Sequence, residues 1–166
     1  MTMSKTEQNL MDAFAGESQA NRKYLAFAKK AEEEGYSQVA KLFRAAAAAE
    51  TIHAHNHLRA SNGVKSTKEN LMAAISGESY EFKKMYPQMI TDAKAERQDY
   101  ALRSFNMANE VEKVHAALYK KALENLGQSI VADYYVCSVC GYTAEGEAPD
   151  ECPVCKAKKQ AFKKAE

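Results

Sequence analysis

The sequence predicts an all-α four-helix bundle over residues 1–127, a linker at 128–133 and a small metal-binding β/loop module at 134–166. Apolar residues recur at helical spacing through the first part of the chain. Acidic residues and two Glu-x-x-His motifs interrupt the apolar stripes of four predicted helices, and all four cysteines fall between 137 and 155. With 166 residues, 46% of them hydrophobic and only three of them proline, the chain can form a helical core with a small appendage.

Charge and hydropathy exclude several classes of function. The formal net charge is +1, so the chain has no basic field to attract nucleic acid or an anionic membrane. Residues 1–8 lack the apolar segment of a signal peptide. No apolar run approaches the roughly 20 residues of a transmembrane helix. We therefore expect a soluble, cytoplasmic protein that binds neither nucleic acid nor membrane.

The first two helices are predicted at about 5–34 and 37–60. Gly35 ends the first helix, Ser37 can cap the second, and the Ser-Asn-Gly sequence at 61–63 ends it. Glu17 lies in the first apolar stripe, which comprises Leu10, Ala13, Phe14, Ala20, Tyr24, Phe27 and Ala28. Glu50 and His53 are three residues apart and therefore share the apolar face of the second helix.

The third helix begins at a capping box formed by Ser66 and Glu69. Glu78 and Glu81 lie on its apolar side, and Pro87 should kink or break the helix. The fourth helix is predicted at about 97–126, before Gly127. It carries a second Glu-x-x-His pair, Glu112 and His115, on a stripe that comprises Phe105, Ala108, Val111, Leu118 and Tyr119.

Five carboxylates on apolar stripes require a common counter-charge. A buried, unpaired carboxylate costs several kcal/mol; lysine or arginine could offset one of them but hardly five. Glu, Glu-x-x-His, Glu and Glu-x-x-His on four helices form the ligand set of a dinuclear metal site in a bundle, and oxygen with imidazole ligands suits iron or manganese. The candidate ligands are Glu17, Glu50, His53, Glu78, Glu81, Glu112 and His115.

The cysteines form a second metal site. Cys137, Cys140, Cys152 and Cys155 make two Cys-x-x-Cys pairs, whose thiolates can close a tetrahedron around one metal. Residues 134–166 are too few for an ordinary core, so the metal would stabilise the module. Spacing alone does not separate zinc from iron and favours a structural zinc ribbon.

These residues resemble the rubrerythrin family along essentially the whole chain. The strongest matches are Ala-Gly-Glu-Ser at 15–18, Ala-Glu-x-x-His at 49–53, Gly-Glu-x-x-Glu at 77–81, Met-Tyr-Pro at 85–87 and Glu-x-x-His at 112–115. The tail, with Tyr-Val-Cys-x-x-Cys-Gly-Tyr and Cys-Pro-x-Cys, is similar to rubredoxin. One departure is Lys156, where rubredoxin-like modules have glycine. A left-handed conformation there would cost about 1 kcal/mol.

The resemblance implies a ferritin-like diiron peroxidase that reduces hydrogen peroxide to water and protects against oxidative stress. Two non-haem irons would bind the seven candidate ligands, with Glu50 and Glu112 bridging, and one iron would exchange Glu81 for His53 between redox states. Tyr24 and Tyr86 match tyrosines that hydrogen-bond the ligand carboxylates. A third iron in the four-cysteine site would relay electrons from reduced rubredoxin or an NAD(P)H-dependent reductase.

Two other functions remain open from the sequence. A ferritin-like ferroxidase or iron-handling protein uses a similar ligand set but needs no four-cysteine relay. A non-catalytic bundle with a zinc ribbon would be colourless, whereas iron held by four cysteines is red.

Chain length between the second and third helices predicts at least a homodimer. A ferritin-like bundle places the second and third helices parallel, so their connection must run the length of a helix. A 24-residue helix is about 36 Å long, but the six residues at 61–66 reach only about 20 Å. Either the bundle is a simple up-down-up-down one, or helices are swapped between two chains, which we favour. The carboxylates lie some 22 Å from the end of the fourth helix. We therefore expect electrons to cross between chains of a homodimer or higher homo-oligomer.

Overall fold

The computed structural model describes residues 3–128 and 131–165. Residues 129 and 130 of the predicted linker lie outside this description. The chain divides into two compact units, Met1–Lys65 and Ser66–Glu166. None of the helices in the described ranges is long and apolar enough to cross a membrane.

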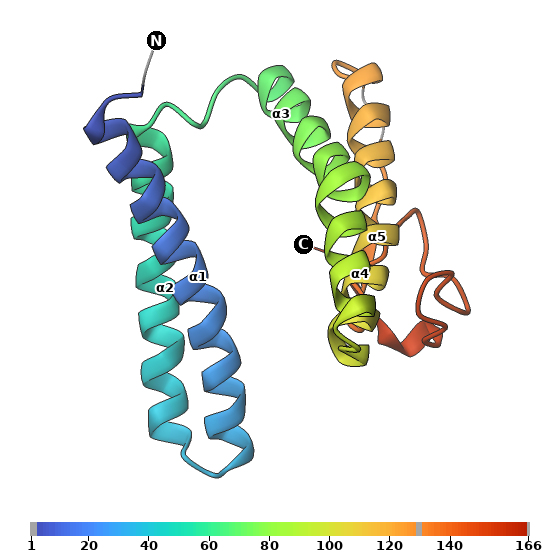
Figure 1. The fold of residues 1–166 in the computed structure, drawn as a ribbon, viewed down its shortest axis with the longest axis horizontal. Helices are drawn as coiled ribbons and strands as arrows, with labels where there is room; N and C mark the ends of the chain where they lie inside the picture. The colour runs from blue at the N-terminus through green and yellow to red at the C-terminus, as the bar shows by residue number, and fades with distance from the viewer. Residues whose placement is uncertain (1–2, 129–130, 166) are drawn as a thin grey trace. The chain divides into compact units, whose positions relative to one another are not determined.

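The first unit is a hairpin of two long helices, α1 (Lys5–Glu33) and α2 (Ser37–Ala60), shown in Figure 1. Gly35, with φ of +85°, allows the tight turn between them. The Asn21 amide of α1 donates to the Ala47 carbonyl of α2 at 2.6 Å. Our expectation that Ser37 caps α2 is wrong: Tyr36 occupies the capping position, without a side-chain hydrogen bond.

The helices of the second unit are α3 (Thr67–Tyr80), the π-helix η1 (Glu81–Met85), α4 (Tyr86–Ala95) and α5 (Asp99–Glu124). The capping box of Ser66 and Glu69 is confirmed at the start of α3. Pro87 cannot donate a backbone hydrogen bond, and the chain accommodates it through the wider π turn, where the Tyr86 N–H donates to the Glu81 carbonyl. The predicted break is therefore local, and the helix continues beyond it.

Small side chains fill the contacts within each helix pair. The buried residues of the described helices are alanines, Asn21 and Val111. Several large apolar side chains are exposed, including Leu42 at 68% and Ile52 at 61%. Phe27, which we placed in the core stripe, is 48% exposed. A helix pair needs a second layer to bury such faces, so neither pair has the complete core of a bundle.

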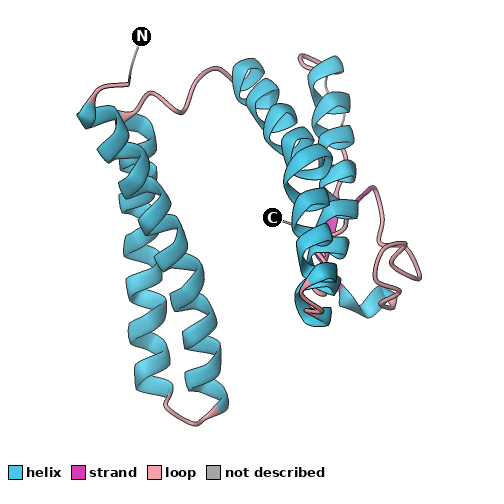
Figure 2. Cartoon of the chain, in the orientation of Figure 1, coloured by secondary structure: helices cyan, strands magenta, loops and turns pink. Residues whose placement is uncertain are grey.

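The C-terminal module is a three-stranded antiparallel sheet with the order β2-β1-β3, visible as magenta segments in Figure 2. Its strands are β1 (Tyr134–Cys137), β2 (Thr143–Glu145) and β3 (Phe162–Lys164), and the 3₁₀ turn η2 (Lys159–Ala161) precedes β3. Cys137 and Cys152 are the largest fully buried side chains among the described residues. The buried centre of the module therefore consists mainly of cysteine side chains, where a larger domain would have a hydrophobic core.

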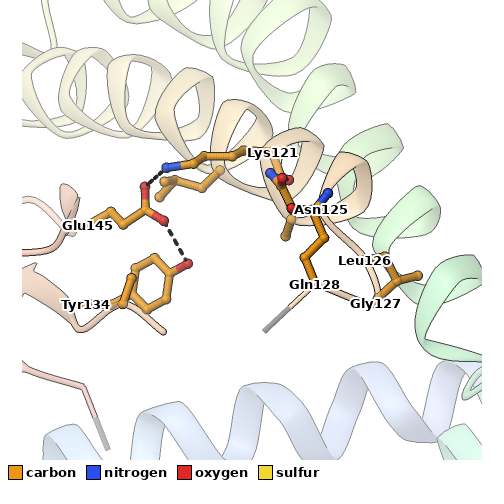
Figure 3. A pocket seen from close by; sticks show the side chains of 10 residues that line it. Lys121, Asn125, Leu126, Gly127, Gln128, Tyr134 and Glu145 are labelled. Atoms are coloured by element: carbon orange, nitrogen blue, oxygen red, sulfur yellow. Dashed lines mark hydrogen bonds and ion pairs between the residues drawn. The ribbon is translucent and has the colours of Figure 1, made fainter. Parts of the chain in front are cut away.

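The module packs along α5 of the same unit. Two side chains of β2 contact α5, in the pairs Thr143–His115 and Glu145–Lys121. Gly141, just before β2, lies close to Val111 of the same helix. Figure 3 shows Lys121 paired with Glu145, which also accepts a hydrogen bond from the Tyr134 hydroxyl at 3.5 Å. The length of α5 therefore does not separate the module from the carboxylates, because the chain folds back along the helix. That electrons cross between chains stays a prediction.

Candidate metal centres

The first unit brings together three of the predicted ligands. Glu17 of α1 and Glu50 and His53 of α2 place one ligand atom each within 4.8 Å of one another. The His53 Nδ1 atom lies 2.9 Å from Glu50 Oε2, as the spacing of three residues on a helix predicts. The Glu50 side chain is 18% exposed and that of His53 is 54% exposed.

The second unit repeats this arrangement with Glu78 of α3 and Glu112 and His115 of α5, again within 4.8 Å. His115 Nδ1 lies 2.8 Å from Glu112 Oε2 and 3.9 Å from Glu78 Oε1. All three side chains are largely buried. The two Glu-x-x-His motifs therefore build the same local geometry on two different helix pairs.

Glu81 lies beside this second cluster, at the first position of the π turn. Burial raises its pKa, and the neighbouring Glu78 carboxylate raises it further. Tyr86 follows the π turn, and its pKa is raised by burial and by the nearby carboxylates of Glu112, Glu81 and Glu78. Burial and these carboxylates therefore favour the protonated form of the Tyr86 phenol.

Tyr24 has different surroundings. Its ring packs against Phe27 and Phe43, with centroids 6.4 and 6.1 Å away. Within the described ranges the structure shows no hydrogen bond from Tyr24 to a carboxylate, so its predicted contact stays a prediction.

The carboxylates lack cationic partners of the ordinary kind. Within residues 3–128 and 131–165, no lysine or arginine forms an ion pair with Glu17, Glu50, Glu78, Glu81 or Glu112. Burial and the adjacent Glu112 carboxylate raise the pKa of Glu78, so the charged cluster is unfavourable by itself. Metal cations would relieve this repulsion, and the oxygen and imidazole donors fit iron.

The four cysteines form the third cluster. Their sulfur atoms all lie within 4.8 Å of one another, and the pairs Cys137–Cys155 and Cys140–Cys152 are each separated by 3.6 Å. That separation is far longer than the roughly 2 Å of a disulfide. Burial alone would raise the pKa of Cys137, but the backbone N–H groups of Val139 and Cys140 donate to its sulfur and bring the net pKa below its usual value. This arrangement fits a tetrahedral metal–thiolate site.

Each Cys-x-x-Cys pair lies in a tight turn, here called a knuckle. The two knuckles have the same backbone turn despite their different sequences. Gly141 has φ of +84° and Lys156 has φ of +64°, and each N–H donates to the carbonyl of the first cysteine of its pair. The left-handed conformation that we considered for Lys156 is thus present.

Sequence reasoning missed Thr143. Its hydroxyl lies 3.0 Å from His115 Nε2, on the ring edge opposite the carboxylates. Threonine is an uncommon metal ligand, and no sequence pattern pairs position 143 with position 115. The only available signal was its place three residues after Cys140.

Comparison with known proteins matches both parts of the chain. The rubrerythrin family model matches residues 8–123, and a second model, described as the rubredoxin-like domain of rubrerythrin, matches residues 135–163. Rubrerythrin-2 of Clostridium acetobutylicum is 34% identical over 95% of each chain. Nigerythrin of Nitratidesulfovibrio vulgaris is 36% identical and aligns with 96% of this chain and 86% of its own length.

Solved structures give the same result. Nigerythrin in a mixed-valence state superposes with a TM-score of 0.59 and 36% identity, covering 99% of this chain and 88% of that one. Its fully reduced, all-ferrous state gives a TM-score of 0.59 and 35% identity, with 99% and 89% coverage.

Proposed function

Since this chain belongs to the rubrerythrin family, we propose that it is a non-haem diiron peroxidase that reduces hydrogen peroxide to water. Membership confirms the predicted ferritin-like helical part and rubredoxin-like module, together with a diiron site and a four-cysteine iron site as cofactors. The observation that carries the proposal is the combination of two matched carboxylate–imidazole clusters with a separate thiolate site in one chain.

The reaction that we propose consumes two electrons and two protons for each peroxide and releases two waters. Two irons held by the seven candidate ligands would supply the two electrons. The protein's own part is to hold the carboxylates against their mutual repulsion. The Tyr86 phenol, whose pKa is raised by burial and by the neighbouring carboxylates of Glu112 and Glu81, would donate its one hydrogen to one of them. The four-cysteine module would return electrons, with reduced rubredoxin or an NAD(P)H-dependent reductase as the external donor.

Ferritin-like iron handling is the rival function. It would use a similar carboxylate set but would have no role for an electron-transfer module that packs against α5. Two measurements distinguish these functions. Peroxide turnover with a reduced donor supports the peroxidase. Iron retained in a protein shell without turnover supports storage.

The experiment for the peroxidase removes one predicted bridging ligand at a time. We expect Glu50→Ala and Glu112→Ala to lose the diiron site and peroxide turnover while keeping the red iron of the four-cysteine site. The matched control is Glu110→Ala on the same helix as Glu112, because Glu110 is exposed and paired with Lys113. Full activity in either bridging variant, or equal loss in the control, would refute the assignment.

We also propose that the diiron site is completed between two chains. Each unit supplies one three-ligand cluster. For both clusters of one chain to meet in a ferritin-like bundle, residues 61–66 would have to run the length of α2. These six residues reach about 20 Å, whereas the 24-residue α2 is about 36 Å long. In such a swapped dimer, each site takes Glu17, Glu50 and His53 from one chain and Glu78, Glu81, Glu112 and His115 from the other. The exposed apolar side chains of α2 would then find a second helical layer.

Mixing two inactive variants tests this swap. In a swapped heterodimer of a Glu50→Ala chain and a Glu112→Ala chain, one site carries both changes and the other site carries neither. About one intact site per heterodimer should therefore regain iron and activity. If each site came from one chain, every site would carry one change, and the mixture would stay as inactive as its parents.

A further inference from the structure

The two histidines of the clusters differ in what their outer ring nitrogens contact. His53 and His115 each place Nδ1 within 3 Å of the glutamate three residues earlier. His115 Nε2 also lies 3.0 Å from the Thr143 hydroxyl of the four-cysteine module. For His53 Nε2, the described part of the chain offers no hydrogen-bond partner. Only one of the two rings is thus held from both sides.

Hydrogen-bond accounting shows which atom carries the hydrogen in the contact between His115 and Thr143. The Thr143 hydroxyl donates to the Gly141 carbonyl at 3.2 Å. A hydroxyl has one hydrogen to donate, so its oxygen acts as the acceptor towards His115. The hydrogen of that contact must then sit on His115 Nε2. In the neutral imidazole, which is the form that binds a metal, Nδ1 then presents its lone pair towards Glu112 and Glu78.

A lone pair directed at two carboxylates is unfavourable without a cation between them. With a metal ion in that position, the same arrangement has every group satisfied. The surroundings strengthen this link, because Thr143 and His115 line one cavity of about 340 Å³ whose other walls are Leu71, Leu118, Tyr119, Ala122 and Tyr134. The His115 side chain is only 27% exposed, and a hydrogen bond partly shielded from water is stronger than one in bulk water.

We propose that Thr143 is a positioning residue for the diiron site, which acts by accepting the Nε2 hydrogen of His115 and holding Nδ1 towards the metal. The inference rests on the proposed role of His115 as an iron ligand. Outer hydrogen-bond partners of metal-bound histidines set the ring orientation and tautomer in this way. Here the partner comes from the other metal module, so the carbonyl of Gly141, next to Cys140, is joined to a diiron ligand through one hydroxyl. The His115 ring is therefore contacted through both nitrogens, whereas the described residues contact His53 only through Nδ1.

Three variants distinguish an effect of Thr143 on the orientation of the His115 ring from an effect on the docking of the four-cysteine module. Thr143→Val keeps the shape of the side chain and removes the hydroxyl, and Thr143→Ser restores the hydroxyl. Lys121→Met removes a second polar link between α5 and the module, the ion pair with Glu145, and leaves Thr143 unchanged.

The first measurement is NMR of the full-length protein loaded with zinc, which is diamagnetic. We expect the His115 Nε2–H signal to be protected from solvent exchange in the wild type and in Thr143→Ser, and to exchange at least about tenfold faster in Thr143→Val. His53 serves as the internal reference, because its ring should exchange rapidly in all variants. The second measurement is the release of diiron to a chelator from iron-loaded protein, which should be about 10–100-fold faster in Thr143→Val than in the wild type.

Unchanged exchange and iron release in Thr143→Val would overturn the proposal. So would an equal acceleration in Lys121→Met, because that result would mean that docking alone retains the iron. Neither measurement uses peroxide. An iron-loaded wild type that fails to turn over peroxide would therefore refute the proposed peroxidase and leave the role of Thr143 standing.

Discussion

The second knuckle of the four-cysteine module is predicted to be strained by one side chain. Lys156 holds φ of +64° where the equivalent position of the first knuckle is Gly141 at +84°. A left-handed conformation costs a residue with a Cβ about 1–2 kcal/mol. Glycine removes that cost but loses about 0.4–1 kcal/mol more conformational entropy on folding. The difference predicts that Lys156→Gly stabilises the module by about 0.5–1 kcal/mol.

The reverse substitution gives the matched test. A Cβ on Gly141 would lie 3.9 Å from Val111 Cγ1, an ordinary contact, so Gly141→Ala should show the backbone cost without a clash. By the same difference we expect it to destabilise the module by about 0.5–1 kcal/mol. The assay is the denaturant midpoint for loss of the red absorbance of the four-cysteine site in iron-loaded protein. If Lys156→Gly lowers the midpoint, or if Gly141→Ala leaves it unchanged, the argument from backbone strain is wrong.

Two further predictions concern stability. Ser66→Ala removes a capping box and should lower the free energy of unfolding by about 1 kcal/mol. Ser37→Ala removes no cap and should change it by less than about 0.5 kcal/mol. Similar losses in both variants, measured by denaturant titration, would contradict the capping assignment. Glu78 and Glu81 have folded pKa values raised above 4.5 by burial and by neighbouring carboxylates, so the folded metal-free protein binds protons more tightly than the unfolded chain. Their contribution is present below pH 4.5 and is lost as pH rises through the raised values, so denaturant midpoints of metal-free protein should increase on mild acidification, and a fall there would refute the sign.

Features that depend on short-range geometry could be predicted from the sequence alone. Helical periodicity located the long helices to within a few residues, and the spacing of three between Glu112 and His115 was enough to place their side chains together, because neighbours on a helix turn share a face. The two Cys-x-x-Cys pairs likewise carried their own geometry, since each knuckle is a local turn.

Features that depend on contacts between distant segments emerged only from the folded chain. Phe27 fits a helical stripe, yet its exposure depends on which helices pack against α1. The position of the four-cysteine module depends on how the chain folds back after Gly127, which no local period encodes. The contact between Thr143 and His115 joins residues 28 positions apart and follows only from that docking. Periodicity reports which residues share a face, whereas the partner of that face is set by the free energy of packing the whole chain.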